Sequence, residues 1–62
     1  MDDFLNLTLK DSGEPVYINV EQIAFIHKDG DATLICFAAN YVKVAESVEE
    51  VLKRIEIFGN AY

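Results

Sequence analysis

The best-defined element in this sequence is a single helix close to its C-terminus. Ser47 and Glu50 form an S-x-x-E capping box, in which the serine hydroxyl accepts a hydrogen bond from the backbone N–H of the glutamate. The apolar residues that follow recur at the spacing of one helix face, which predicts a helix over residues 48–57. They are Val48, Val51, Leu52 and Ile55. The sequence therefore predicts one helix that begins directly after Ser47.

The segments before this helix have the pattern of short strands separated by turn residues. Leu5, Leu7 and Leu9 alternate with polar residues, as in a strand with one buried face. Asn19 is suited to cap a single helical turn between the second and third strands. The five expected strands span about residues 4–10, 15–19, 22–28, 32–37 and 41–45. We expect one domain over residues 1–62 in the α+β class, a small antiparallel β-meander of four to five strands with one C-terminal helix packed on the sheet.

The third and fourth expected strands are apolar on both faces, unlike the first strand. A strand with one hydrated face should alternate, so one face of this pair should meet the helix and the other a curled sheet or another chain. We predict that the spare apolar row mediates self-association, and that two residues near the end of the helix contact a protein partner. The row consists of Ala24, Ile26, Ile35 and Phe37, and the helix residues are Ile57 and Phe58.

The small size of the chain also favours self-association. A 62-residue chain buries only about 60% of the surface that its unfolded form exposes. Cys36 is the only cysteine, so no disulfide can form within the chain, yet 52% of the residues are hydrophobic. We therefore expect a homo-oligomer, most simply a homodimer.

The charge and hydropathy exclude several partner classes. The chain has eleven acidic and five basic residues, with a formal net charge of −6, so nucleic acid is an unfavourable partner. No stretch approaches the 18 or so uninterrupted apolar residues that cross a bilayer. The start, Met1-Asp2-Asp3, is acidic and unlike a signal peptide, so we expect a cytoplasmic protein.

Few residues have side chains and surroundings suited to catalysis or metal binding. Cys36 lies in the middle of an apolar strand with no neighbouring cation to activate it, and a core position is the simpler interpretation. His27, the only histidine, has no evident nucleophile or orienting partner. The Asp29-Gly30-Asp31 segment lacks the ligand run of a calcium loop and is better read as a turn. We expect no enzyme activity, no metal and no cofactor.

The order of motifs along the chain resembles a known family. The relevant segments are Gly13-x-Pro15-x-Tyr17-Ile-Asn19, Ile23-x-x-Ile26, Thr33-Leu-Ile, Tyr41-Val-x-Val44 and Glu46-Ser-Val-Glu-Glu-Val51. Across residues 5–56 this pattern resembles the FlbD/SwrD family, small bacterial proteins linked to flagellar function and swarming motility. The resemblance implies a role in motility and supplies no catalytic motif. The chain departs from the family pattern at Ala38-Ala39, where a glycine-bearing turn is usual.

A weaker, partial resemblance covers about residues 18–55. There the chain is similar to part of a LytTR DNA-binding domain, which implies a nucleic-acid-binding regulator as the alternative function. The loops that reach DNA in that family are basic, whereas here they carry aspartate and alanine. We therefore expect a non-enzymatic protein-interaction or regulatory module, related to motility by resemblance.

Overall fold

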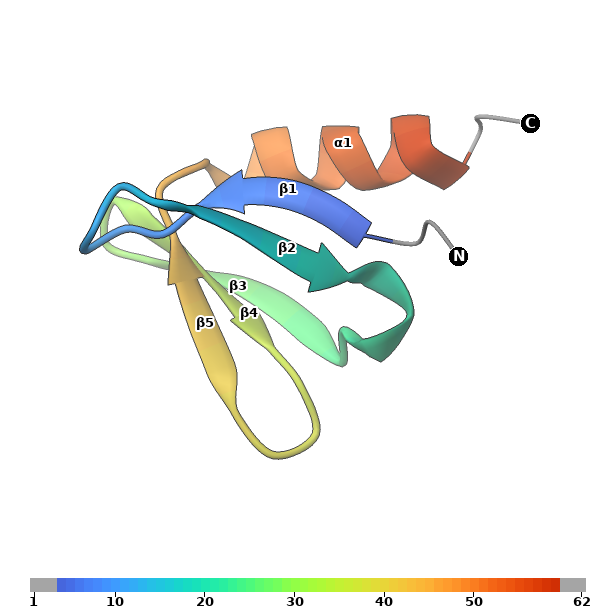
Figure 1. The fold of residues 1–62 in the computed structure, drawn as a ribbon, viewed down its shortest axis with the longest axis horizontal. Helices are drawn as coiled ribbons and strands as arrows, with labels where there is room; N and C mark the ends of the chain where they lie inside the picture. The colour runs from blue at the N-terminus through green and yellow to red at the C-terminus, as the bar shows by residue number, and fades with distance from the viewer. Residues whose placement is uncertain (1–3, 60–62) are drawn as a thin grey trace.

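The computed structural model describes the backbone of residues 4–59 and the side chains of residues 4–57 (Figure 1). Its first unit is a hairpin of β1, Phe4–Thr8, and β2, Pro15–Asn19. The register places Leu5 opposite Ile18, and both side chains are buried. Gly13 supplies a positive φ of 76° in the connecting turn. The alternating leucines therefore form the inner face of a two-stranded sheet, as their spacing predicts.

A short 3-10 helix, η1, follows β2 over Val20–Gln22. The side chain of Asn19 accepts a hydrogen bond from the backbone N–H of Glu21, and so it caps this turn as expected. Because η1 occupies the start of the segment expected to be the third strand, β3 begins only at Phe25 and runs over Phe25–Asp29.

β3 pairs with β4, Ala32–Cys36, which in turn pairs with β5, Tyr41–Val44. The loop between β3 and β4 consists of Gly30 and Asp31, and Gly30 has a φ of 63° at the first loop position. Glycine is required at this position in a type II′ hairpin turn, and asparagine or aspartate is poorly suited to replace it. All five expected strands are thus present.

The sheet arrangement differs from the expected meander. The described strands form two antiparallel sheets, β1-β2 and β3-β4-β5, because η1 turns the chain between β2 and β3. The two sheets meet instead through β1 and β5. Leu9 forms an isolated antiparallel bridge with Val44, and the backbone N–H of Ala45 donates to the carbonyl oxygen of Thr8 at 2.8 Å. Strands at opposite ends of the sequence therefore close the structure, which is a long-range contact that a meander lacks.

The helix α1 spans Val48–Gly59 and lies beside β1, at the opposite end of the molecule from the β4–β5 loop (Figure 1). Its start matches the capping box, since Ser47 Oγ accepts a hydrogen bond from the backbone N–H of Glu50 at 3.1 Å. Val51 is fully buried, whereas Leu52 is about half exposed and lies at the margin of the apolar stripe. Residues from both sheets and from α1 form one core: Leu5, Leu7, Ile18, Ile35, Val44 and Val51.

Candidate interaction surface

The register of the three-stranded sheet assigns its side chains to two faces. Side chains directly opposite one another on neighbouring strands point to the same face. Ile35 lies opposite Ile26 on one side and Val42 on the other, and it is completely buried, so this row faces the core. Cys36 lies opposite Phe25 and Tyr41, and this second row therefore forms the outer face.

The apolar row predicted to be spare is largely the inner one. Ile35 is 0% exposed, and Ile26 and Phe37 pack against the core cluster. Ala24 is exposed, next to the start of β3. The free face is thus the opposite one, and this corrects the assignment made from the sequence. Both rows are apolar, so the choice between them depends on the side from which α1 and the β1-β2 sheet approach.

The two residues predicted at the end of α1 have different outcomes. Ile57 is 60% exposed and could contact a partner. Phe58 lies outside the residues whose side chains the structure describes. The role of both residues in an interface stays a prediction.

The outer face combines exposed aromatic rings with few charges. Phe25 is 58% exposed and Tyr41 is 65% exposed, although they flank the buried thiol of Cys36. The ring of His27 stacks on that of Phe25, with ring centroids 6.2 Å apart and an interplanar angle of 20°. At the far end of this face Lys43 pairs with Asp29 at 3.6 Å. Large exposed apolar side chains gathered on one face are typical of an interaction surface.

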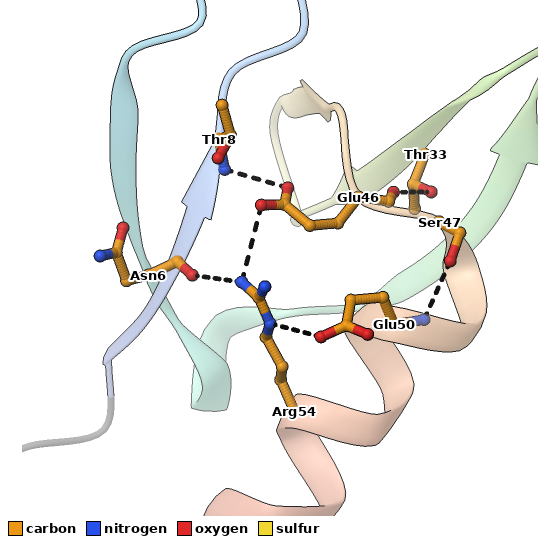
Figure 2. Close-up of polar contacts among 7 residues, drawn as sticks. All are labelled: Asn6, Thr8, Thr33, Glu46, Ser47, Glu50 and Arg54. Atoms are coloured by element: carbon orange, nitrogen blue, oxygen red, sulfur yellow. Dashed lines mark hydrogen bonds and ion pairs between the residues drawn. The ribbon is translucent and has the colours of Figure 1, made fainter.

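A polar cluster around Glu46 lies between β1 and the start of α1 (Figure 2). The backbone N–H of Thr8 donates to Glu46 Oε1 at 3.0 Å, and Arg54 Nη1 lies 3.6 Å from Glu46 Oε2. The hydroxyl of Thr33 donates to the carbonyl oxygen of Glu46 at 2.6 Å. Burial alone would raise the pKa of Glu46, but the Thr8 hydrogen bonds and the Arg54 charge outweigh it and hold the pKa below its ordinary value of 4.5.

The same cluster covers a strand edge. Arg54 Nη1 donates to the carbonyl oxygen of Asn6 at 3.0 Å, while Arg54 Nε donates to Glu50 Oε2 at 2.8 Å (Figure 2). Asn6 and Thr8 present their backbone groups on the side of β1 away from β2, so Glu46 and Arg54 occupy the place of a neighbouring strand. Covering an edge in this way prevents it from pairing with another chain. The sequence indicates the Glu50–Arg54 pair by its spacing, but Glu46 carries no comparable signal.

The described residues bring no catalytic group together. Nδ1 of His27 contacts the carbonyl oxygen of its neighbour Lys28 at 3.1 Å, and no nucleophile is paired with this ring in the part of the chain that the structure describes. No group of three or more His, Cys, Asp or Glu residues within residues 4–57 could hold a metal ion. A groove of about 590 Å³ runs between the β3–β4 turn and the start of α1. The hydroxyl of Thr33, in the wall of this groove, donates to the carbonyl oxygen of Glu46. This hydroxyl therefore has a structural role.

Within the described residues, α1 is too short to cross a membrane.

Comparison with known proteins supplies the family. Searches of curated proteins and of solved structures gave no match. The family model of FlbD, described as flagellar and swarming motility proteins, matches residues 7–61, which is most of the chain. The chain therefore belongs to the FlbD family of flagellar and swarming motility proteins.

Proposed function

We propose that this chain acts in flagellar or swarming motility as a non-enzymatic protein-interaction module, working through the outer face of the β3-β4-β5 sheet. The family supports the setting. The observation that carries the rest is the pair of exposed aromatic residues on one sheet face, Phe25 and Tyr41. Aromatic side chains dominate the energetics of protein interfaces because each buries a large area at little entropic cost.

The state of the polar groups supports a role without catalysis. Glu46 is the described carboxylate with a shifted pKa, and both of its carboxylate oxygens are engaged by groups that hold β1 and α1 together. Its pKa is lowered, whereas a general acid at neutral pH needs a raised one. The thiol of Cys36 is buried, with Phe25 and Tyr41 opposite it on the neighbouring strands, so it fits a structural position.

Complementation of a deletion strain tests this proposal. Swarming and swimming should be lost when the gene for this chain is deleted and should return with the wild-type copy. Cys36→Ala removes the buried thiol, the side chain best suited to covalent chemistry, and it should restore motility. Phe25→Asp should fail to restore it, although the protein accumulates to a normal level.

A matched variant controls for exposed aromatic residues in general. Tyr17 on β2 is 65% exposed, as Tyr41 is, but it lies on the β1-β2 sheet. Tyr17→Asp should therefore restore motility. Normal motility with Phe25→Asp, or loss of motility with Tyr17→Asp, with the protein folded and present, would overturn the proposal.

A further inference from the structure

We infer that the edge of β3 that faces away from β4, together with the groove at the start of α1, binds an extended segment of another protein. The segment adds a strand to the three-stranded sheet, places an apolar side chain in the groove and has lysine or arginine beside it. We call this surface the edge site, and it comprises Ile26, Lys28, Asp31, Ala32, Val48 and Glu49. The inference goes beyond the proposed function, because it concerns the edge of the sheet rather than its outer face.

The first observation is that the fold covers its strand edges unequally. The edge of β1 is occupied by Glu46 and Arg54. β5 is joined to the end of β1, where the backbone N–H of Lys10 donates to the carbonyl oxygen of Lys43 at 3.0 Å. β2 begins with Pro15, which has no backbone N–H to offer another strand. β3 is the end strand of its sheet, and within residues 4–59 no backbone hydrogen bond joins its outer edge to another strand. An uncovered edge is where an added strand pairs.

The hairpin register shows which backbone groups of β3 face outwards. In a hairpin with a two-residue loop, the residues that flank the loop, here Asp29 and Ala32, form a hydrogen-bonded pair, and such pairs alternate along the strands. Ile26 and Lys28 therefore direct their backbone N–H and C=O groups away from β4. The Lys28 carbonyl oxygen is contacted by Nδ1 of His27 at 3.1 Å, in an exposed position where an added strand can replace the ring. The edge thus offers a partner strand two donors and two acceptors.

The second observation is that the groove of about 590 Å³ borders the end of this edge. Lys28 and Thr33 lie opposite one another in the register, so they point to the same face of the sheet. Both line the groove together with Val48 of α1. A residue of an added strand opposite Lys28 directs its side chain to this face as well, and so into the groove. Ala32 and Val48 make part of the wall apolar, which favours an apolar side chain there.

The charge of the groove and of the chain identifies the occupant. Asp31 and Glu49 are exposed on the rim of the groove, where Lys28 is the single base. Asp31 pairs with Lys10, yet its side chain is 86% exposed. The net charge of −6 attracts a basic segment to this rim and repels a second copy of the chain. The edge site therefore fits an extended basic segment of a different protein.

Amide exchange and chemical shifts of the isotope-labelled protein, followed during titration with a synthetic peptide, test the inference. The probe is a short capped peptide in which lysine and valine alternate. At saturation the amide signals of Ile26 and Lys28 should shift, and their exchange should slow at least about tenfold, because each N–H gains a partner. The same peptide methylated on its backbone nitrogens keeps its charge and side chains but cannot donate, so it should change neither. A peptide of alternating glutamate and valine should not bind.

Variants of the chain locate the site. Lys28→Pro removes an outward N–H and leaves the ladder to β4 intact, so the dissociation constant of the lysine–valine peptide should be at least about fivefold larger than for Lys28→Ala, which removes the same charge and keeps the N–H. Glu49→Lys reverses a charge on the rim and should weaken binding at least about twofold. Glu56→Lys makes the same change on an exposed residue near the other end of α1 and should have a smaller effect.

Dispersed amide signals establish that each variant is folded, and the comparison with the methylated peptide decides if Lys28→Pro is not. Unchanged signals of Ile26 and Lys28 at millimolar peptide would overturn the inference, as would equal binding of the methylated peptide. Exchange that slows in the protein alone as its concentration rises would place a second copy on the edge and would overturn it too. These outcomes leave the proposed function standing, because Phe25→Asp in the motility assay tests the outer face separately.

Discussion

Arg54 and Asn6, which are 48 positions apart in the sequence, are joined by a hydrogen bond of 3.0 Å from the guanidinium to the backbone carbonyl oxygen. The contact fixes α1 against the edge of β1, and the same guanidinium pairs with Glu46 and Glu50. Arginine is suited to this position because its several donors have a fixed planar geometry that a lysine ammonium lacks. The helix is therefore attached to the sheet by a polar clamp as well as by the buried Val51.

Removing this clamp should destabilise the fold. Arg54→Ala loses the bond to Asn6 and both ion pairs, so we expect the free energy of unfolding to fall by about 1–2 kcal/mol, a modest value because the side chain is partly exposed. Lys53→Ala changes the same charge on an exposed neighbour and should cost less than about 0.5 kcal/mol. Urea denaturation followed by circular dichroism measures both. Equal effects of the two substitutions would show that the clamp adds no stability.

The lowered pKa of Glu46 predicts a specific loss of stability in acid. Because the folded state favours the ionised carboxylate, the contribution of Glu46 is present above its unfolded pKa of about 4.5. It is lost as the pH falls below that value through the folded pKa. Urea midpoints of the wild type and Glu46→Gln, measured from pH 2.5 to pH 7, should differ at neutral pH and converge in acid. A difference that grows towards low pH would contradict this assignment.

The cap at Ser47 should contribute to the stability of α1. Ser47→Ala removes the hydroxyl that accepts from the backbone N–H of Glu50, and we expect a loss of about 0.5–2 kcal/mol. Ser47→Asp keeps an acceptor and adds a favourable charge at the helix start, so it should retain most of the stability. Ser12 offers a matched control, since its hydroxyl accepts from Glu14 within an exposed turn. A lower melting temperature for Ser12→Ala than for Ser47→Ala would contradict the capping role.

The assignment of the two sheet faces is tested by one substitution on each. Ile35→Asp places a carboxylate in a site with no exposed surface, and we expect it to abolish folding because the cost of several kcal/mol exceeds what a domain of this size can lose. Phe25→Asp changes an exposed ring, and we expect a loss of about 1 kcal/mol or less. Amide proton spectra will show dispersed signals for the second variant alone. Dispersed signals from Ile35→Asp would mean that the faces are reversed.

The sequence predicted those elements that depend on neighbouring residues. The Ser47 cap, the Asn19 cap and the alternating leucines of β1 are local signals, and each is present in the structure. The Asp29-Gly30-Asp31 segment was likewise predicted to be a turn, and the loop between β3 and β4 consists of Gly30 and Asp31. The helix, the five strands and the family were accordingly predictable from the chain alone.

The features that the sequence did not predict depend on contacts between distant residues. The two sheets are joined by the bridge between Leu9 and Val44, which no local pattern encodes. The inner and outer rows of β3 and β4 are similarly apolar, so only the side on which Val51 packs decides that Ile35 is buried. In the sequence, nothing distinguishes Glu46 from the other acidic residues near the start of the helix. Its role depends on its contacts with Thr8 and Arg54, which are distant in the sequence.

The most direct test of this account is the solution mass of the wild-type chain beside that of Tyr41→Asp, measured by light scattering at matched concentrations. An interface centred on the exposed rings of Phe25 and Tyr41 predicts a dimer for the wild type and a folded monomer for the variant. A monomeric wild type, or a variant that dimerises as well as the wild type, would contradict the claim that this sheet face is where the protein meets its partner.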